Sequence, residues 1–335
     1  MAVKTAVTLR DVAAHANVSV MTVSAVLSGK ADERRISTAT RIKVQESARL
    51  LGYRPNAVAR SLRRRSTNVI GLYSGLGYLN AANPFLAELI GGLQEACDRY
   101  RKDLLLLGTF RGLSVDDIYA ELLDGRLDGL VVQAPPSDPL VTRLAESHLP
   151  VVAVADTFPC VPSVVVDDAA GGRLIAEHLF EEGYRQAVYV AKADPIVSSE
   201  RRRSSFLQTA LRLGIAVSEV ACRSEVDSGW QQSASAHCTT ASDRPTAVCC
   251  WCDLVALSYL HFCVDNNVSV PGEVAVTGFD GFSFQGALRK PLTTIRAPWD
   301  DVGRASISLL VGMQDDGAPP RETVIPVELV RGETT

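Results

Sequence analysis

The chain has 335 residues, of which 47% are hydrophobic, and its formal net charge is −4. This length favours two or three domains over a single ordinary core. No apolar run approaches 18 residues, which argues against a membrane-spanning chain, and the first seven residues lack the apolar stretch of a secretory signal. We therefore expect a cytoplasmic protein. The eight cysteines lack the regular spacing of a disulfide scaffold, in agreement with a reducing compartment.

The net charge hides an uneven distribution along the chain. Residues 1–67 hold thirteen Lys and Arg against four Asp and Glu, whereas the rest of the chain holds 21 against 34. The two parts thus carry +9 and −13. A basic head on an acidic body is typical of a phosphate-binding module joined to a domain that does not bind nucleic acid. Arg63–Arg65 could also be a simple solvated run, although the adjacent head favours a DNA contact.

The first 54 residues predict three short helices. Apolar side chains recur with helical spacing over residues 9–16, 20–27 and 37–51, and Gly52 ends the third stretch. The expected N-caps are the hydroxyl residues Thr8, Ser19 and Ser37. Two short helices cannot bury much alone, so we expect all three to pack together. The second helix of such a head enters the major groove of DNA.

A proline-led segment, residues 55–67, follows the predicted head. Pro55 stands where a helix can begin, and Ala57 and Ala59 would let two such helices from two subunits approach closely. The segment is too short to be stable as an isolated helix. We therefore predict a hinge that becomes helical only on DNA.

From Asn68 onward, short apolar runs alternate with amphipathic stretches. A first series predicts strands over 69–73, 104–107, 129–133 and 151–155, with helices over 84–101, 114–123 and 139–147 between them. A second series predicts strands over 163–166, 187–191, 247–251 and 274–277, with helices over 169–182, 201–213 and 254–266. This alternation is typical of parallel sheets covered on both faces and indicates two α/β lobes.

Motifs in a fixed order across nearly all of the chain carry a family resemblance. The head contains VTLRDVA (7–13), VSVMTVS (18–24) and GYRPNAVARSL (52–62). The body contains NPF (83–85), DGL (128–130), CDLVAL (252–257), VP (270–271), GFD (278–280) and PLTTI (291–295). Together they resemble the lactose-repressor/galactose-repressor family of bacterial transcription regulators.

The resemblance implies an all-α helix-turn-helix head, a hinge helix and an α/β two-lobed, periplasmic-binding-protein-like domain. The expected boundaries are 1–54 for the head, 55–67 for the hinge helix and linker, and 68–335 for the effector-binding and dimerisation domain. Lobe 1 is expected over 68–166 plus 296–323, and lobe 2 over 167–295 plus 324–332. The chain would cross between the lobes near Val166, Ile295 and Val324.

The resemblance also assigns DNA-contacting residues in the head. Val20 and Met21 take the base-reading positions, whereas phosphate-positioning roles fall to Thr8, Ser19, Thr22 and Ser24. Simple helix capping is a compatible role for Thr8 and Ser19. Ala25 stands where the family usually carries an arginine that grips guanine. An apolar face of Val20, Met21 and Ala25 would contact thymine methyl groups, unless specificity falls mostly to DNA shape and the hinge.

In the hinge, the family's leucine wedges into the minor groove and kinks the duplex, and Leu62 stands at that place. Leu62 could instead be a linker residue that packs on the body. The remaining hinge contacts implied by the resemblance are Tyr53, Asn56 and Ala59, with Arg60–Arg65 on phosphates.

The family's effector positions correspond to polar and aromatic residues that follow the predicted strands. They are Asp156, Arg202, Trp230, Asp253 and Asp280, with Ser74 and Phe85 as further candidates. Carboxylates and a guanidinium can bind hydroxyls, and an indole can pack on a pyranose. These groups favour a neutral sugar or glycoside. Nucleosides, amino-acid-like metabolites and phosphosugars remain alternatives.

Several of these residues have simpler interpretations. Asp253 can cap the helix that follows it, Asp280 can close a turn, and Trp230 can belong to the core. Cys252 replaces the family's usual asparagine and Gly281 its common second acid, so two polar ligands of the usual site are missing.

The run Cys249-Cys250-Trp251-Cys252 contains a C-x-x-C spacing, but no second Cys or His pair at metal spacing accompanies it. We interpret these cysteines as structural and expect neither metal nor cofactor. The scattered histidines form no catalytic constellation, which disfavours an α/β enzyme acting on sugars. A sugar-binding or transport protein would explain the body but not the basic head. The leading interpretation is a homodimeric regulator, most often a repressor in this family, that binds operator DNA under the control of a small-molecule effector.

Overall fold

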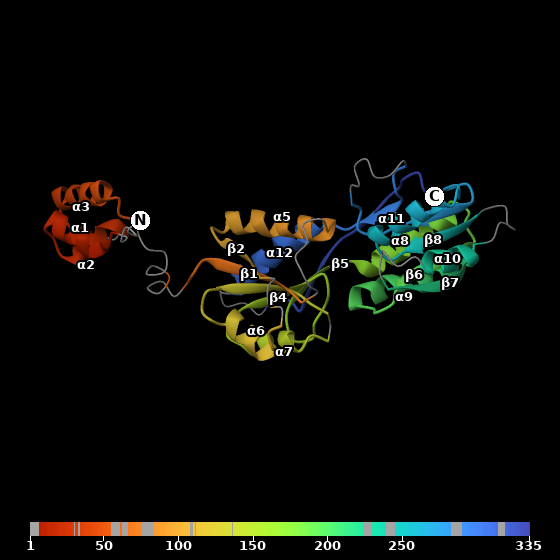
Figure 1. Cartoon of the computed structure of the whole chain (residues 1–335), viewed down its shortest axis with the longest axis horizontal. Coiled ribbons are helices and arrows are strands. Elements are labelled where there is room, and N and C mark those ends of the chain that lie inside the picture. Colours follow the sequence, from red (N-terminus) through yellow and green to blue (C-terminus); the bar gives the residue numbers. More distant parts are fainter. Residues whose placement is uncertain are drawn as a thin grey trace. The chain divides into compact units, whose positions relative to one another are not determined.

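The computed structural model describes residues 7–29, 31–32, 34–54, 61, 66–75, 83–107, 110, 112–135, 137–223, 229–238, 245–282, 290–313 and 319–335. The chain forms two compact units, Met1–Thr67 and Asn68–Thr335 (Figure 1). The first unit is helical, and the second contains two parallel sheets covered by helices and one antiparallel pair of strands.

The first unit contains three helices, α1 (Leu9–Ala16), α2 (Val20–Leu27) and α3 (Thr38–Leu51), which confirms the three that the sequence predicts. Each follows a hydroxyl residue whose side-chain oxygen accepts a hydrogen bond from a backbone N–H three residues later. Asn17 and Gly52 end α1 and α3 in left-handed backbone, with φ of 48° and 67°.

The core of this head is small and apolar. It consists of Val12, Ala13, Ala16, Val23, Val26, Ala31, Val44 and Ala48. The His15 ring also forms a hydrogen bond with Ser47, at 3.0 Å between Nδ1 and Oγ, and this contact ties α1 to α3. Val20 and Met21, the first two residues of α2, lie outside this core, so their side chains are available to a partner.

Lobe 1 of the second unit contains a six-stranded parallel sheet with the order β11-β5-β4-β3-β1-β2. Its strands are β1 (Val69–Ser74), β2 (Asp103–Leu107), β3 (Gly129–Gln133), β4 (Val151–Val154), β5 (Ser163–Val166) and β11 (Glu322–Ile325). Helices α5 (Pro84–Arg99) and α12 (Trp299–Gly312) cover one face, and α6 (Val115–Leu122) and α7 (Pro139–Ala145) cover the other (Figure 1).

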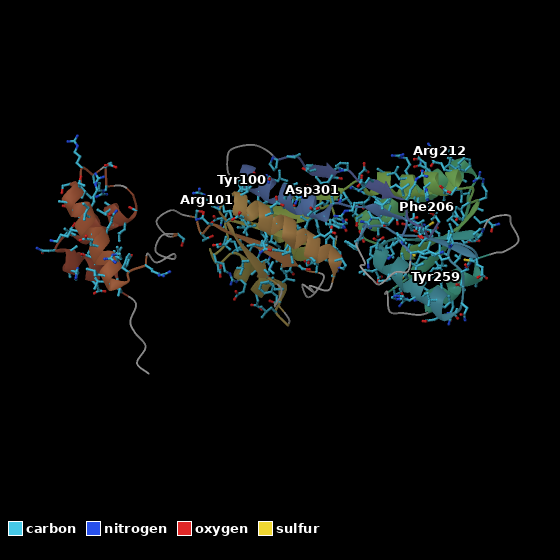
Figure 2. The ribbon with its side chains drawn as sticks, turned by 90° about the horizontal axis from the view of Figure 1, so that it is seen from above. Tyr100, Arg101, Phe206, Arg212, Tyr259 and Asp301 are labelled. Carbon is cyan, nitrogen blue, oxygen red and sulfur yellow. The ribbon has the colours of Figure 1, made fainter. Side chains whose placement is uncertain are left out.

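The two helices on the first face pack backbone to backbone. A Cβ added to Gly92 of α5 would lie 1.9 Å from the carbonyl oxygen of Asp300, and one on Gly303 of α12 would lie 2.6 Å from that of Leu89. Only glycine allows this approach. Asp301 of the same helix is exposed, as the side-chain view shows (Figure 2).

Lobe 2 contains a four-stranded parallel sheet with the order β7-β6-β8-β9. Its strands are β6 (Gln186–Lys192), β7 (Ala216–Cys222), β8 (Thr246–Cys250) and β9 (Val274–Thr277). Helices α8 (Asp168–Glu181) and α9 (Val197–Leu213) contribute to the core on one face, and α10 (Gly229–Ala236) and α11 (Asp253–Asp265) to the core on the other.

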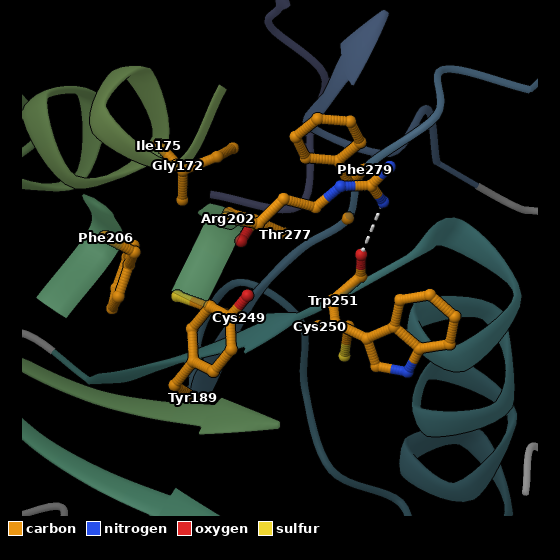
Figure 3. A pocket seen from close by; sticks show the side chains of 11 residues that line it. Gly172, Ile175, Tyr189, Arg202, Phe206, Cys249, Cys250, Trp251, Thr277 and Phe279 are labelled. Carbon is orange, nitrogen blue, oxygen red and sulfur yellow. Dashed lines mark hydrogen bonds between the residues drawn. The ribbon is translucent and has the colours of Figure 1, made fainter. Parts of the chain in front are cut away.

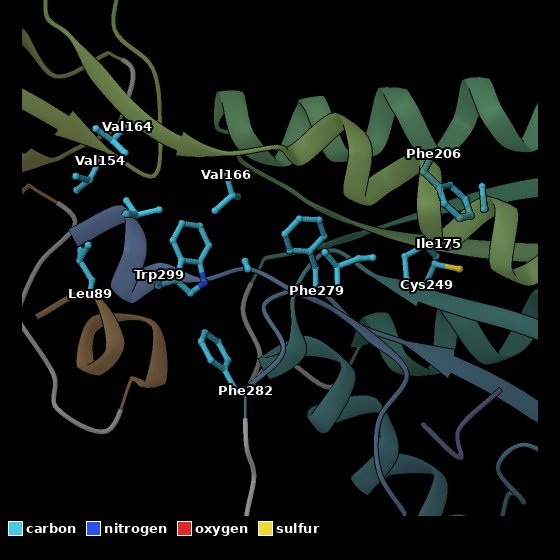
Figure 4. Close-up of a cluster of buried hydrophobic side chains, with 14 of the residues drawn as sticks. Leu89, Val154, Val164, Val166, Ile175, Phe206, Cys249, Phe279, Phe282 and Trp299 are labelled. Carbon is cyan, nitrogen blue, oxygen red and sulfur yellow. The ribbon is translucent and has the colours of Figure 1, made fainter. Parts of the chain in front are cut away.

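The lobes are joined by three chain crossings. β5 leads directly into α8, β10 (Thr294–Arg296) leads into α12, and β11 leads into β12 (Glu328–Val330), which pairs antiparallel with β10. One cluster of buried side chains runs through both lobes, from Leu89 and Trp299 on one side to Phe279 and Phe206 on the other (Figure 4).

The predicted strands of both lobes are confirmed, but several elements were not predicted. They are β7, α10, β10, α12, β11 and β12. Strand β7 is a half-exposed edge strand and α10 reads GWQQSASA, so neither has a strong apolar period. Helix α9 begins at Val197 instead of residue 201. Val324 still pairs with Val165 in lobe 1, so the third crossing follows Ile325.

The C-x-x-C run lies at the end of β8 and the start of α11. Cys249 and Cys250 belong to the cores on opposite faces of the sheet. All three thiols are free and buried, and burial raises the pKa of Cys249 to about 12. A structural role for these cysteines agrees with this placement. Among the described helices, none is long and apolar enough to cross a membrane.

Candidate functional site

The head presents an apolar face at the start of α2. Met21 is 65% exposed and Val20 is 41% exposed, although both belong to a helix whose other valines are buried. Ser19 is exposed beside them, and its hydroxyl lies 2.9 Å from that of Thr22. Large exposed apolar side chains can contact base edges, while the N-terminal amides of the same helix can contact phosphates.

Ala25 does not belong to this face, which corrects the expectation of a three-residue apolar reading surface. It is only 5% exposed, so little of its methyl group can reach a base. The exposed reading surface therefore consists of Val20 and Met21. Ser24, in the same helix, is half-buried.

The hydroxyl of Thr8 already has partners within the head. It accepts a hydrogen bond from the N–H of Asp11 at 3.4 Å and donates one to the Asp11 carboxylate at 2.7 Å. The backbone and hydroxyl of Thr8 lower the pKa of Asp11. Capping is thus the role visible for Thr8.

Of the hinge contacts implied by the resemblance, only Tyr53 is described. Its ring is half-buried and packs against the core of the head, and its N–H donates to the carbonyl of Ala48 at 2.8 Å. Asn56, Ala59 and Leu62 lie outside the described residues.

Arg202 of α9 is the centre of a buried polar cluster in the second unit. Its Nε donates to Asp168 Oδ1 at 2.7 Å. Its Nη1 donates to the carbonyl of Trp251 at 3.1 Å, the bond dashed in Figure 3. Nη1 also lies 3.7 Å from Asp280 Oδ1. The guanidinium carbon lies 3.6 Å from the centroid of the Phe279 ring. The positive charge of Arg202 is thus stabilised by a cation–π contact as well as by the carboxylates.

Asp156 connects this cluster to lobe 1. It follows β4, and its Oδ1 accepts hydrogen bonds from the N–H groups of Ser198 at 3.0 Å and Thr157 at 3.2 Å. Ser198 belongs to the first turn of α9 in lobe 2, so the carboxylate caps a helix of the opposite lobe. Burial raises the pKa of Asp156 although these N–H groups oppose the shift.

Asp253 is fully buried at the start of α11 and is already hydrogen-bonded. Its Oδ1 accepts from the hydroxyl of Thr294 at 2.5 Å, and its Oδ2 accepts from the N–H of Phe282 at 2.9 Å. Burial raises its pKa to about 6. Asp253 therefore holds Phe282 after β9 and Thr294 of β10. The alternative that Asp253 caps the helix after it is wrong, because Cys252 is the N-cap residue of α11 and no side-chain cap bond is present.

Asp280 follows β9 in a strained backbone conformation, with φ of 122°. Its N–H donates to the carbonyl of Ile295 at 2.8 Å, and its carbonyl accepts from the N–H of Ala297 at 3.0 Å. Burial raises the pKa of its carboxyl well above the ordinary range, more than the nearby Arg202 lowers it. These bonds make a parallel bridge between Asp280 and Arg296 of β10, while the side chain lies near Arg202.

Trp230 is not brought to this cluster, which corrects its assignment as an effector-binding residue. It is 4% exposed in the core between β8, α10 and α11, where its ring stacks on Tyr259 at 6.0 Å between centroids. The alternative interpretation, a core tryptophan, matches this placement. Trp251, the half-buried residue after β8, contacts Arg202 through its backbone carbonyl, which accepts the hydrogen bond from Nη1.

The two further candidates lie in lobe 1. Ser74 is buried at the end of β1, and its hydroxyl donates to Gln133 Oε1 at 3.2 Å. Phe85, in the first turn of α5, packs edge-on against Trp299 at 4.7 Å between centroids. No contact joins either of them to Arg202 among the bonds of the described residues.

Sequence reasoning missed Asp168, the residue in closest contact with Arg202. It is 2% exposed in the first turn of α8, and burial raises its pKa to about 6 although Arg202 opposes the shift. The available signal was its position directly after β5, because Asp156 follows β4 in the same way and the carboxyl ends of neighbouring parallel strands meet at one edge.

Two ion pairs reinforce the contact between the lobes. Arg201 of α9 donates to both carboxylate oxygens of Glu322 in β11, at 2.6 and 3.1 Å. Arg296 of β10 reaches both oxygens of Glu88 in α5, at 2.9 and 2.8 Å. These ion pairs connect side chains of the two lobes in this structure.

The space beside Arg202 is small. A cavity of about 10 Å³, lined by Tyr189, Cys249 and Phe279 among others, could hold about one water molecule (Figure 3). A sugar is far larger than this cavity. This cavity lies within lobe 2, so it is not itself an effector site.

Comparison with known proteins adds to this geometry. Residues 8–56 match the family described as bacterial regulatory proteins, lacI family, and residues 176–335 match a periplasmic binding protein-like domain. The HTH-type transcriptional repressor PurR of Photobacterium profundum is 31% identical over 317 residues, with 91% of each chain covered.

The chain belongs to the lacI family of bacterial regulatory proteins. A crystal structure of the Lac repressor dimer bound to operator and the anti-inducer ONPF is similar to this lacI-family chain, with a TM-score of 0.82 and 25% identity over 98% of this chain and 99% of that one. A complex of the transcriptional regulator CelR with cellobiose has a TM-score of 0.70 and 26% identity, covering 98% and 100%.

This lacI-family protein is a DNA-binding transcriptional repressor regulated by an effector. It is not an enzyme, as the sequence analysis expected. Its helical head and its parallel-sheet domain both match the Lac repressor fold.

Proposed function

We propose that this repressor binds its operator as a homodimer, that Val20 and Met21 read base edges, and that a neutral sugar or glycoside is the effector. The observation that carries the DNA-reading part is the exposure of Val20 and Met21 at the capped start of α2. Two copies would place two such helices in successive major grooves, as helix-turn-helix dimers do. The Lac repressor, to which this chain is similar, is a dimer in its operator-bound crystal structure.

Methyl and thioether groups favour a particular type of base contact. They offer no hydrogen bonds, so the pair would recognise thymine methyl groups and discriminate less than a bidentate arginine. The phosphate contacts would come from the helix N-terminus at Ser19 and Thr22 and from the basic segment up to residue 65. Leu62 would wedge into the minor groove and kink the operator.

The sugar proposal rests on the cluster around Arg202. The carboxyl groups of Asp168 and Asp280 lie against the single guanidinium of Arg202, and its charge also acts on those of Asp156 and Asp253. This excess of carboxyl groups favours a ligand rich in hydroxyls over an anionic one. CelR, a protein of similar fold, binds cellobiose. Sugar binding would alter operator affinity because the lobes and the hinge form one continuous chain, and their equilibria are linked.

The experiment is a selection of genomic fragments by purified full-length protein in moderate salt, where non-specific phosphate binding is weak. We expect a pseudo-palindromic site to be enriched. Met21→Ala should weaken binding to that site by about tenfold or less, because an apolar contact with the base edges is lost and such a contact discriminates less than a bidentate pair, worth about 1–3 kcal/mol.

Ile42→Ala is the matched control, because Ile42 is an apolar residue of the same head that is 51% exposed on α3. It should leave the affinity unchanged. No enriched site, or equal effects of the two substitutions, would contradict the proposed reading face.

A further inference from the structure

Three chain segments meet at the amino end of the lobe 1 sheet, on the edge opposite to Asp156. Asn68 stands directly before β1, Lys102 directly before β2 and Asp128 directly before β3. Strand β1 lies between the other two and pairs with both. Asn68 is also the first residue of the second unit, so the chain that comes from the head enters lobe 1 at this edge.

The backbone of Asn68 is held from both sides. Its N–H donates to Asp128 Oδ2 at 2.9 Å, and its carbonyl accepts from the N–H of Asp103 at 2.7 Å. The N–H of Asp128 donates in turn to the carbonyl of Val69 at 2.7 Å. Asn68 has a φ of 59°, in the left-handed region that asparagine tolerates better than most residues. These bonds and this φ fix both the position and the direction of the chain at this residue.

A buried ion pair holds the carboxylate that binds Asn68. Lys102 Nζ lies 2.9 Å from the same Asp128 Oδ2, and the two side chains are 11% and 8% exposed. Burying two charges carries a desolvation penalty, and apolar side chains of similar volume often give equal or greater stability. A charged acceptor, however, binds an amide more strongly than a neutral one does. The pair is therefore better suited to holding the N–H of Asn68 than to stabilising the sheet in general.

A fixed exit point matters for operator binding because two heads of a dimer act together. Once one head is bound, the other binds from within the complex, at an effective concentration set by the length and stiffness of its linker. Each residue released from the sheet adds up to about 3.5 Å of reach. The rise of one base pair is about 3.4 Å. Releasing the chain at Asn68 would therefore let the heads reach half-sites at other spacings.

We propose that Asp128 and Lys102 are positioning residues for operator binding, which fix the point where the linker leaves lobe 1 and so determine the half-site spacing that the repressor accepts. Both act through the backbone of Asn68 rather than through contact with DNA. The inference rests on the proposed homodimer with two half-sites, and it adds to that function a determinant of operator choice. It involves neither the effector nor a change in the arrangement of the lobes.

Two double variants of the full chain separate this anchoring from general stability. Lys102→Met/Asp128→Leu replaces both charges with apolar side chains of similar volume and removes the acceptor for the N–H of Asn68. Lys102→Met/Asp128→Asn removes the same charges, but the asparagine Oδ1 can still accept that bond. Asp103→Asn is the matched control at the same edge, because it removes an exposed carboxylate while the backbone N–H that binds Asn68 stays.

The probes are synthetic operators that carry the selected half-sites at the selected spacing, and at spacings one base pair shorter and longer. Fluorescence anisotropy gives their Kd values, and urea unfolding gives the stability of each variant. We expect the wild type and Asp103→Asn to bind the selected spacing about tenfold more tightly than the others. The leucine variant should bind it more weakly and prefer it by less than about threefold. The asparagine variant should keep most of the preference, at a similar unfolding free energy.

The inference is overturned if the leucine variant keeps the wild-type spacing preference, or if the asparagine variant loses it equally. A fall in affinity that is the same at every spacing also contradicts it, because a merely destabilised domain would behave in that way. If the leucine variant does not fold, hydrogen exchange of the wild type decides. The Asn68 amide should exchange slowly, and exchange as fast as in a peptide exposed to water would reject the anchor.

The same measurements distinguish failure of this inference from failure of the proposed function. A wild type that selects no operator rejects the proposed function. A wild type that selects an operator but binds all three spacings equally rejects this inference alone.

Discussion

The two functional regions of this repressor present opposite chemistry. In the head, the side chains that we propose to read DNA are apolar and exposed, as Met21 shows. In the effector domain, the residues around the proposed effector site are charged and buried, as Arg202 and Asp253 show. Exposing these apolar side chains costs the head little folding free energy. Burying the charged groups of the cleft costs the effector domain more, and a bound ligand can lower that cost by supplying hydrogen bonds. We therefore expect substitutions in the cleft to change the unfolding free energy more than substitutions in the exposed face of the head.

Removing the central cation should have the largest effect. Arg202→Ala leaves the carboxyls of Asp168 and Asp280 buried without their cation, so we expect the effector domain to lose about 3–5 kcal/mol of unfolding free energy. Effector response should be lost as well. Urea unfolding followed by circular dichroism measures the first effect.

Arg212 provides the control on the same helix. Its side chain is 67% exposed and lies 3.7 Å from Glu177, and Figure 2 shows it at the outer side of lobe 2. Arg212→Ala should cost less than about 1 kcal/mol, because exposed ion pairs contribute little. Equal losses in the two variants would show that the buried cluster carries no special cost.

The pH dependence of the unfolding free energy gives a second test of the buried cluster, this time through the proton that Asp168 binds. Burial raises the pKa of Asp168 from 3.8 to about 6, so the folded chain holds this proton more tightly than the unfolded chain. The contribution of Asp168 is therefore most favourable below about pH 4 and is lost as the pH rises through about 6, a change of about 3 kcal/mol. Asp168→Asn should lack this decline.

Chemical unfolding of the wild type, Asp168→Asn and Asp167→Asn across this pH range measures the difference. The wild type and Asp167→Asn should lose stability relative to Asp168→Asn as the pH rises. Parallel profiles for all three proteins would argue that the Asp168 carboxyl has an ordinary affinity for protons.

The head could be predicted from the sequence because its determinants are local. Thr8, Ser19 and Ser37 cap the helices that follow them directly, and the apolar spacing identifies the buried sides of those helices. The error at Ala25 is also informative. The resemblance gave a family position for residue 25, but whether an alanine side chain reaches the surface there depends on how closely α2 packs on its neighbours.

The cleft could be predicted only in outline. Acidic residues after parallel strands indicated an edge where a ligand can bind, and Asp156, Arg202 and Asp280 do meet there. The pairing of Arg202 with Asp168 joins residues 34 positions apart, and no periodicity encodes it. Trp230 was misassigned because an indole suits a sugar and a core equally well, and only the tertiary neighbour Tyr259 decides between them.

The smallest effect is expected from adding a charged side chain to α2, which would make the reading face of the head less apolar. In Ala25→Arg, the longer side chain can extend from the buried Cβ to the surface and donate two hydrogen bonds to a guanine. We expect the selected operator to gain one guanine per half-site, with a preference of about 1–3 kcal/mol over other bases at that position. Ala25→Met, which is long but cannot donate, should keep the wild-type sequence preference. If Ala25→Arg selected the wild-type motif unchanged, α2 would not lie in the major groove as proposed, and specificity would rest on DNA shape and the hinge.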